Sequence, residues 1–385
     1  MDVADRTELF QESVIRKMTR VCQRYQGINL AQGFPEKDPP AEVVSAAVQA
    51  IQQGSNQYSI TWGLPALREA VAGKFSRFAG LNADPEREVT ITCGCSEAIV
   101  ASLMALVNPG ERVIVFEPFY ENYLPGLILC GGVPEYVRLR DPDWSLDPDE
   151  LRQAFSKRPK AMILNTPCNP SGKVFSRDEL EMIAGFCREH GTIVITDEIY
   201  EHILYDGLQH NHMAALPGMW EQTVTISGIS KSYSATGWRV GYAIAHHRLM
   251  SAIRKCHDYM VVCAPTPFQL GAVVAMGLPD SYYRELQQFY RERRDYLLTV
   301  FEELAIPVFR PQGAYYMMIR IDTLGRGDDE TFSMALAEEV GLAVVPGSSF
   351  YHRPEDGRDK VRFCFAKKWE TLNQIKSRLG RFLGR

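Results

Sequence analysis

One lysine and one arginine, eight residues apart, lie among small and hydroxyl-bearing residues in a stretch that could carry out chemistry. The stretch runs from Ser227 to Tyr242 and reads SGISKSYSATGWRVGY. Lys231 follows a run of β-forming residues, 223–227, so we expect its amine to be poorly solvated. Desolvation favours the free amine over the ammonium ion, and a free amine is a nucleophile that can form a Schiff base with a carbonyl.

Arg239 supplies the second reactive group of this stretch. A guanidinium is charged at any working pH and can hold a phosphate through two parallel hydrogen bonds. A lysine that forms a Schiff base beside an arginine that binds phosphate predicts an aldehyde cofactor carrying a phosphate, which is pyridoxal 5′-phosphate. The alternative is that Lys231 is an ordinary solvated lysine in a chain with 42 lysine and arginine residues.

The elements that would position these groups alternate between strand and helix from Val89 onward. This alternation predicts an α/β layer with a mostly parallel central sheet. Fewer than 15 residues join the last two strands, which is short for a parallel crossover, so we expect these two to pair antiparallel. The strands are expected at 89–93, 112–116, 133–138, 160–165, 192–196, 223–227 and 240–245.

Polar residues follow several of these strands directly. Open α/β sheets bind ligands at the carboxyl ends of their strands, so polar clusters that meet at one edge predict a binding site. The antiparallel pair brings the arginine to the same edge as the lysine. The residues concerned are Cys95 and Ser96, Asn169, Asp197, and Lys231 with Arg239.

The rest of the chain predicts a smaller α+β region. Helical spacing occurs at 8–25, 282–304, 330–340 and 369–383, and strands are expected near 314–320, 342–346 and 360–366. We therefore predict an N-terminal segment (1–40) that packs with the small domain, a large cofactor-binding α/β domain (41–281) and a C-terminal small α+β domain (282–385).

Composition argues against several classes of protein. A net charge of −5, with 45% hydrophobic and 23% charged residues, gives no reason to expect a nucleic acid or an anionic membrane as partner. The sequence contains no run of about 20 apolar residues and no pattern of a secretory signal, so we expect a cytoplasmic protein. Nine scattered cysteines without CxxC spacing argue against a disulfide framework or a metal site.

The stretch around Lys231 resembles the lysine motif of class I aminotransferases of the pyridoxal-phosphate fold type I family. The resemblance extends from NLAQGFP (29–35) to VRFCF (361–365) and is nearest to the kynurenine, glutamine and methionine aminotransferase branch. It implies the fold type I architecture, in which a mostly parallel sheet with one antiparallel strand is joined to a smaller α+β domain, and it implies a homodimer.

The resemblance also implies roles for single residues. Lys231 would bind the cofactor and then act as general base, and Asp197 would keep the pyridine nitrogen protonated. Arg362 would hold the substrate α-carboxylate through a bidentate pair. The cofactor phosphate would contact Arg239, Ser230 and the backbone amides of Cys95 and Ser96 at the start of a helix. Tyr120 would stack on the cofactor ring, and Asn169 and Tyr200 would form hydrogen bonds with its 3′-oxygen. Asn169 and Gly33 would also contact the substrate, and Tyr58 and Trp62 would contribute to the site of the neighbouring subunit.

Plainer alternatives stay open for these residues. Asp197 could be a strand-end cap, Arg362 a surface charge and Gly33 a simple turn residue. There is also one departure from the pattern, because Gly228 stands where many relatives have a serine three residues before the lysine. A phosphate contact is missing at that position, and Ser227 is an uncertain substitute.

The expected activity is the transfer of an amino group between an L-amino acid and a 2-oxo acid by a ping-pong mechanism. Aromatic residues near the expected pocket favour aromatic, methionine or glutamine side chains, and we identify no second arginine for a dicarboxylate. One alternative is a pyridoxal-phosphate-dependent β-lyase of the cysteine-conjugate type on the same fold. Another is a regulatory protein of this fold, against which the negative net charge argues. The aromatic residues are Trp62, Tyr120, Tyr123 and Phe350.

Overall fold

The computed structural model describes residues 3–385 and contains one large sheet of eight strands. Their order is β2-β9-β8-β7-β6-β3-β4-β5, and all seven strands expected from the sequence are among them. The strands are β2 (Val89–Thr92), β3 (Arg112–Glu117), β4 (Val133–Arg140), β5 (Ser145–Leu146), β6 (Ala161–Asn165), β7 (Ile193–Asp197), β8 (Thr223–Gly228) and β9 (Gly241–Ala245).

Strand directions agree with the mostly parallel sheet that the sequence predicts. β4, β3, β6, β7 and β8 pair in parallel, and β9 runs antiparallel to both β8 and β2. The expectation of a single antiparallel strand is wrong in one detail, because β5 pairs antiparallel with β4 at the outer edge. A strand of two residues is too short to show an alternating pattern, so the sequence does not reveal it.

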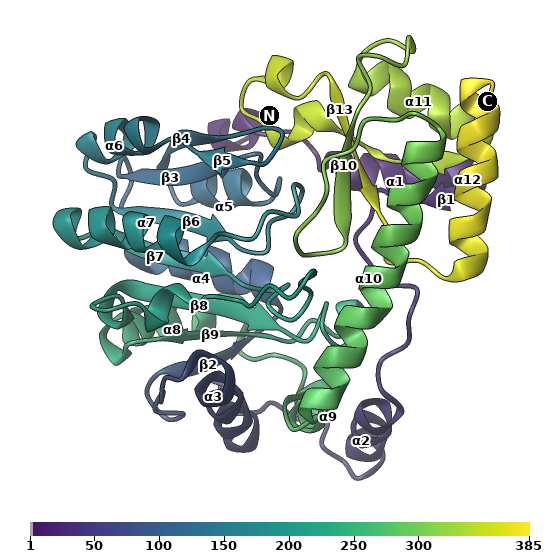
Figure 1. The fold of residues 1–385 in the computed structure, drawn as a ribbon. Coiled ribbons are helices and arrows are strands. Elements are labelled where there is room, and N and C mark those ends of the chain that lie inside the picture. The colour runs from purple at the N-terminus through teal and green to yellow at the C-terminus, as the bar shows by residue number, and fades with distance from the viewer. Residues whose placement is uncertain (1–2) are drawn as a thin grey trace.

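Helices cover both faces of this sheet (Figure 1). Val113 and Val115 of β3 face the layer of α4, α5 and α8, whereas Ile114 and Phe116 face α6 and α7. This alternation is the period of two expected for a strand that is buried on both faces. The helices are α4 (Cys95–Leu106), α5 (Tyr123–Leu129), α6 (Pro148–Ser156), α7 (Arg177–His190) and α8 (His247–Val261), with α2 (Ala41–Gln52), α3 (Pro65–Ala79) and α9 (Thr266–Met276) around the β2 end of the sheet.

A second region lies to one side of the large sheet, at the upper right of Figure 1. Its sheet has the order β10-β13-β12, and β1 pairs in parallel with β11, so the N-terminal segment joins this region. The long helix α10 runs from α9 to this region. The domain boundaries at 40 and 281 stay a prediction. The elements are α1 (Val14–Arg24), β1 (Ile28–Asn29), α10 (Asp280–Glu303), β10 (Tyr316–Arg320), α11 (Asp329–Val340), β11 (Leu342–Ala343), β12 (Val345–Pro346), β13 (Lys360–Cys364) and α12 (Trp369–Leu383).

The first helix is shorter than its apolar spacing predicts. α1 begins at Val14, and a separate 3-10 turn occupies Asp5–Leu9. Ser13 caps the helix through its side chain, and Glu121 accepts hydrogen bonds from the amides of Val14 (3.0 Å) and Ile15 (3.4 Å). An N-terminal cap of this kind sets the residue at which a helix begins, whatever the apolar spacing of the residues before it. Along residues 3–385, none of the helices combines the length and apolarity needed to cross a membrane.

Gly228 is required by the close approach of β8 and β9. It pairs with Gly241, and a Cβ on Gly228 would lie 2.9 Å from both the Gly241 Cα and the Val240 carbonyl oxygen. Real Cβ atoms essentially never approach backbone atoms this closely. The departure at this position therefore has a steric cause, because a serine there would collide with the neighbouring strand.

We predict that Gly228→Ser lowers the free energy of unfolding by about 1–3 kcal/mol, the usual cost of overpacking. Urea unfolding of the cofactor-free protein measures this. Gly237→Ser is the matched control, because a Cβ there would meet no heavy atom within 4 Å. Equal losses of stability in the two variants would show that the contact between the strands is not the cause.

Candidate active site

The carboxyl ends of β6, β7 and β8 face a cavity of about 440 Å³. These strand ends are on the side of the large sheet that is turned toward the second region (Figure 1). The sheet edge predicted from the sequence is therefore the edge that carries a cavity. The predicted residues that line it are Gly33, Cys95, Ser96, Tyr120, Asn169, Asp197, Tyr200, Ser230, Lys231 and Arg239.

Lys231 lies in the loop after β8, and its amine has no carboxylate partner among residues 3–385. The Nζ donates a hydrogen bond to the Gly33 carbonyl at 2.6 Å. Burial lowers the pKa of Lys231 from its ordinary 10.5 to about 8, so a substantial fraction of the amine is neutral near physiological pH. A neutral, buried amine next to a cavity is suited to attack a carbonyl carbon.

Asp197 ends β7 and is buried without a cationic partner in the described part of the chain. One oxygen accepts a hydrogen bond from the Tyr123 hydroxyl at 2.7 Å, and the other accepts from the Ile199 amide at 3.3 Å. Burial raises the pKa of Asp197 to about 6, although both hydrogen bonds oppose the shift. A ligand that carries a protonated nitrogen would supply the charge that this carboxylate lacks.

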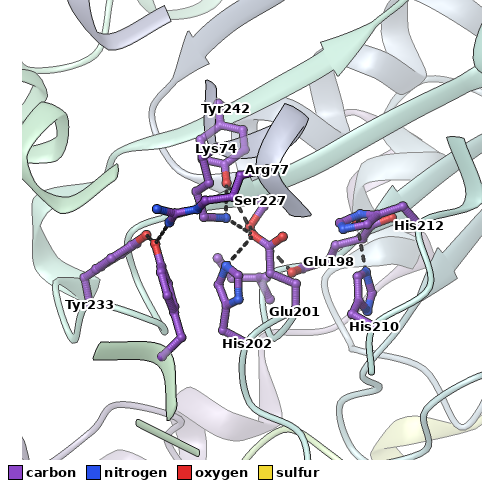
Figure 2. A network of polar contacts seen from close by, with 12 residues as sticks. Lys74, Arg77, Glu198, Glu201, His202, His210, His212, Ser227, Tyr233 and Tyr242 are labelled. Carbon is purple, nitrogen blue, oxygen red and sulfur yellow. Dashed lines mark hydrogen bonds and ion pairs between the residues drawn. The ribbon is translucent and has the colours of Figure 1, made fainter. Parts of the chain in front are cut away.

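The next acidic residue, Glu198, contrasts with Asp197 because it has two partners (Figure 2). His210 Nε2 lies 2.9 Å and His212 Nδ1 lies 2.6 Å from the same Glu198 oxygen. Burial alone would raise the pKa of Glu198, but the two imidazoles outweigh it and lower the pKa to about 2. Glu198 is therefore held in a structural network.

Glu201 forms the second part of this network (Figure 2). It accepts hydrogen bonds from Lys74 Nζ and from the Ser227 hydroxyl, both at 2.7 Å. The Tyr242 hydroxyl donates to the same oxygen at 3.3 Å. Because the buried Ser227 hydroxyl is already bonded to Glu201, Ser227 does not take over the phosphate contact that is missing at Gly228.

The first turn of α4 offers backbone amides that no side chain caps. The helix begins after Gly94, which has φ of +83° and provides no side-chain cap, so the amides of Cys95 and Ser96 stay available to a ligand. A Cβ on Gly94 would lie 2.3 Å from Arg239 Nη2, so the glycine lets the guanidinium approach this turn. Arg239 itself has φ of +54° and donates a hydrogen bond to the Thr236 carbonyl at 3.0 Å. Free amides beside a guanidinium suit a phosphate.

Arg362 is fully buried and lies behind the cavity wall. Its Nη1 donates to the Asn169 side-chain oxygen at 2.6 Å, and its Nη2 donates to the Ala31 carbonyl. The guanidinium carbon lies 4.2 Å from the centre of the Tyr316 ring, and the Nε has no partner in the described structure. The cavity wall in front of the guanidinium is thus formed by Asn169 and Tyr316.

Besides the buried Arg362 and Phe350, two more of the residues expected near the site do not line the cavity of their own chain. Tyr58 is 81% exposed, and Trp62 lies beneath the Arg254 guanidinium, whose carbon is 4.1 Å from the ring centre. The sequence-based expectation places both in a neighbouring subunit's site, and a single chain leaves that expectation untested.

Sequence reasoning gave no individual role to several residues of the site. Tyr316 on β10 lines the cavity, and the Tyr200 hydroxyl donates to the Tyr316 hydroxyl at 3.1 Å. Asn165 donates to the Asp197 carbonyl at 2.8 Å and accepts from the Asn169 amide at 2.7 Å, which fixes the loop after β6. The segment 165–172, which reads NTPCNPSG, contains two asparagines, and this repetition was a usable signal for Asn165. No sequence pattern marks Tyr316.

These residues fit pyridoxal 5′-phosphate. The Lys231 amine, with its lowered pKa, suits its aldehyde, the unpaired Asp197 suits its pyridinium nitrogen, and the α4 turn with Arg239 suits its phosphate. Gly33 must be a glycine here, since a Cβ would overlap the Tyr316 hydroxyl at 1.6 Å.

Comparison with known proteins gives one consistent family. The profile described as aminotransferase class I and II matches residues 25–379. Kynurenine–oxoglutarate transaminase 1 of Mus musculus is 36% identical over 400 residues, covering 94% of this chain and 93% of the relative. The solved structure of N-succinyldiaminopimelate aminotransferase from Mycobacterium tuberculosis superposes with a TM-score of 0.96 at 36% identity, covering 99% of this chain and 100% of that one. An Escherichia coli protein with a methionine aminotransferase function gives 0.94 at 34% identity, with coverage of 99% and 100%. The chain therefore belongs to the class I and II aminotransferases, a family of enzymes that depend on pyridoxal 5′-phosphate.

Proposed function

We propose that this aminotransferase works by a ping-pong mechanism in the cytoplasm, as a homodimer, on an L-amino acid with an aromatic, methionine or glutamine-like side chain and on a 2-oxo acid. The observation that carries the mechanism is the pair of ionically unpaired groups, the half-buried Lys231 and the buried Asp197, in one cavity. When bound, the cofactor supplies an electron sink for the negative charge that develops at the substrate Cα. The names of the relatives support the substrate range.

Lys231 is the catalytic base of this proposal. A group with a pKa of about 8 can take up and release a proton near neutral pH, which is the property that a general base needs. Its Nζ takes the proton from the substrate Cα in the first half-reaction. In the second half-reaction it returns a proton to the same carbon of the acceptor.

Asp197 holds the proton on the pyridine nitrogen, and Tyr123 orients the Asp197 carboxylate through its hydroxyl. Arg362 and Asn169 bind the substrate α-carboxylate together, because Arg362 Nη1 already donates to Asn169. The remaining contacts follow the predicted roles of Gly33, Tyr120, Tyr200, Ser230, Arg239, Cys95 and Ser96, with Tyr58 and Trp62 contributed by the partner subunit.

An amino-donor screen tests the substrate range. Purified enzyme is incubated with single amino acids against several 2-oxo acids, and the 2-oxo product of each donor is measured. The proposal requires product from aromatic, methionine or glutamine donors. Pyruvate and ammonia released from a β-substituted cysteine conjugate, without a 2-oxo product from any donor, would show instead that the enzyme is a β-lyase.

Borohydride reduction of the yellow, cofactor-loaded protein should fix a pyridoxyl group on Lys231, because its amine lines the cavity and has a lowered pKa. Peptide mass mapping locates the label. Lys231→Ala protein should remain unlabelled. A label on Lys173 or Lys255 would make the assignment wrong.

Asp197→Asn should lower turnover by orders of magnitude, yet stabilise the cofactor-free protein at neutral pH. The folded pKa of about 6 exceeds the ordinary 3.8, so the unfolded chain releases this proton first as pH rises. The cost of the buried charge therefore grows between about pH 4 and pH 6 and is complete above that, at about 2–3 kcal/mol. Urea unfolding from about pH 5 to pH 8 measures the difference between the variant and the wild type.

Glu198→Gln is the opposite control for this prediction. Its partners lower the folded pKa to about 2, so the ionised Glu198 stabilises the fold and the substitution should destabilise it at neutral pH. If Asp197→Asn and Glu198→Gln change stability in the same direction, the unpaired state of Asp197 is not what distinguishes it.

The dimer proposal predicts complementation between two inactive proteins. Exposed apolar residues, Tyr58, Ile60, Tyr259 and Val262, are consistent with a subunit interface. Lys231→Ala protein should be inactive, and Tyr58→Ala protein should bind the cofactor weakly. In a mixed two-fold dimer one site receives both intact residues, so co-refolding should restore sites of normal affinity and turnover. If mixed dimers form and restore nothing, Tyr58 does not complete the partner's site.

A further inference from the structure

A fully buried histidine lies behind the first turn of α4, the turn that the proposed function assigns to the cofactor phosphate. This residue is His257 of α8, and it contacts the buried carboxylate of Glu97 in α4. Neither residue lines the cavity, so both lie behind the wall to which Cys95 and Ser96 belong. The proposed function gives neither of them a part.

His257 faces hydrogen-bond acceptors on both sides of its ring. Its Nε2 lies 2.9 Å from the Thr61 carbonyl oxygen, so this nitrogen must carry a hydrogen and donate it. Its Nδ1 lies 3.1 Å from each oxygen of Glu97, and one of these oxygens also accepts from the Cys93 amide at 3.1 Å. A neutral imidazole has one N–H, so the geometry favours an imidazolium that donates on both sides. Burial alone would lower the pKa of His257, but the bonds to Glu97 and Thr61 outweigh it and raise the pKa.

Glu97 and Arg239 meet at one residue of the turn. The Glu97 carboxylate accepts from the Cys93 amide, and Arg239 Nη2 donates to the Cys93 carbonyl at 3.5 Å. The uncapped amides of Cys95 and Ser96 follow directly in the chain. A phosphate held by these amides and by Arg239 would therefore lie close to the negative charge of Glu97. Like charges repel strongly where water is largely excluded.

The imidazolium removes this conflict without occupying the turn. The Glu97 carboxylate keeps its bond to Cys93, which fixes the start of α4, while its pair with His257 carries no net charge. The potential at the turn is then set by Arg239, the uncapped amides and the α4 dipole, all of which attract an anion. By linkage, protonation of the pair and binding of an anion at the turn favour each other.

We propose that His257 is a positioning residue for the cofactor, because its imidazolium neutralises Glu97 and so lets the α4 turn attract the cofactor phosphate. This inference rests on the proposed function, in which the turn and Arg239 hold that phosphate. His257 acts through Glu97 and does not line the cavity itself. Its bond to the Thr61 carbonyl also ties the turn to the segment that carries Tyr58.

The test compares pyridoxal 5′-phosphate with pyridoxal, which has the same aldehyde but no phosphate, in titrations of the cofactor-free protein at neutral pH. The ratio of the two affinities isolates the contribution of the phosphate, because a general disturbance of the site weakens both ligands. In His257→Gln this ratio should fall at least about fivefold, the lower end of typical couplings between two sites. Arg239→Gln, which removes a direct contact, should lower the ratio as well.

A second substitution separates charge from structure. Glu97→Gln should leave the ratio unchanged or raise it, because the amide keeps an acceptor for Cys93 without a charge. The double variant, Glu97→Gln with His257→Gln, should return the ratio to within about twofold of the wild type, since no unpaired charge remains. The matched control is His212→Gln, which removes another buried imidazole from the carboxylate of Glu198 and should leave the ratio unchanged.

An unchanged ratio in His257→Gln, or a double variant as weak as that single variant, would overturn the inference. If Arg239→Gln lowers the ratio and His257→Gln does not, the phosphate site stands and only the role of His257 fails. If neither variant changes the ratio, the phosphate site of the proposed function fails with it. Where His257→Gln does not fold, Glu97→Gln decides alone: a lowered ratio overturns the inference, and an unchanged or raised ratio supports it.

Discussion

One uncompensated charge governs the reactive part of this protein. Asp197 is buried at the end of β7, yet its oxygens accept hydrogen bonds only from neutral donors, Tyr123 and Ile199. An ionised carboxylate in this environment is a standing cost to the folded state until a cation lies beside it. A ligand that brings a protonated nitrogen removes this cost, so ligand binding and folding stability are coupled at this single residue.

The polar network next to Asp197 engages the neighbouring acidic residues, Glu198 and Glu201. Glu198 is held by two histidines, and Glu201 is held by Lys74 and Ser227, so these basic groups are engaged by other carboxylates. The charge of Lys231 lowers the pKa of Asp197, but burial outweighs it. These bonds also tie α3 and β8 to the end of β7, since Lys74 lies on α3 and Ser227 on β8. The same contacts that stabilise the fold therefore keep Lys74, His210 and His212 engaged with Glu198 and Glu201 and not with Asp197.

The sequence predicts the sheet edge of the site well, because strand runs followed by polar residues place Asp197 and Lys231 by simple geometry. It does not predict that Arg362 lies behind Asn169, since this depends on how β13 packs against the large sheet. The prediction of where α1 begins is wrong for a similar reason, because the Ser13–Glu121 contact at its start joins residues 108 positions apart. Local periodicity carries no information about partners that only the tertiary fold brings together.

We infer that the residues that distinguish one substrate side chain from another lie at the rim of the cavity. The relatives are named for kynurenine, methionine and N-succinyldiaminopimelate, although all are similar to this chain over nearly its whole length. In the proposed mechanism the inner groups would meet the α-amino and α-carboxylate groups, which every such substrate shares, so they would not discriminate among side chains. The outer wall of the cavity includes residues from Ser13–Arg16 and Gln32–Phe34, which lie before and after β1 in the chain. β1 pairs with β11 of the second region, so this wall is tied to that region. Apart from Gly33, whose carbonyl accepts the Lys231 hydrogen bond, these residues lie outside the large sheet, so they can differ between relatives while the strand ends that carry Asp197 and Lys231 stay in place.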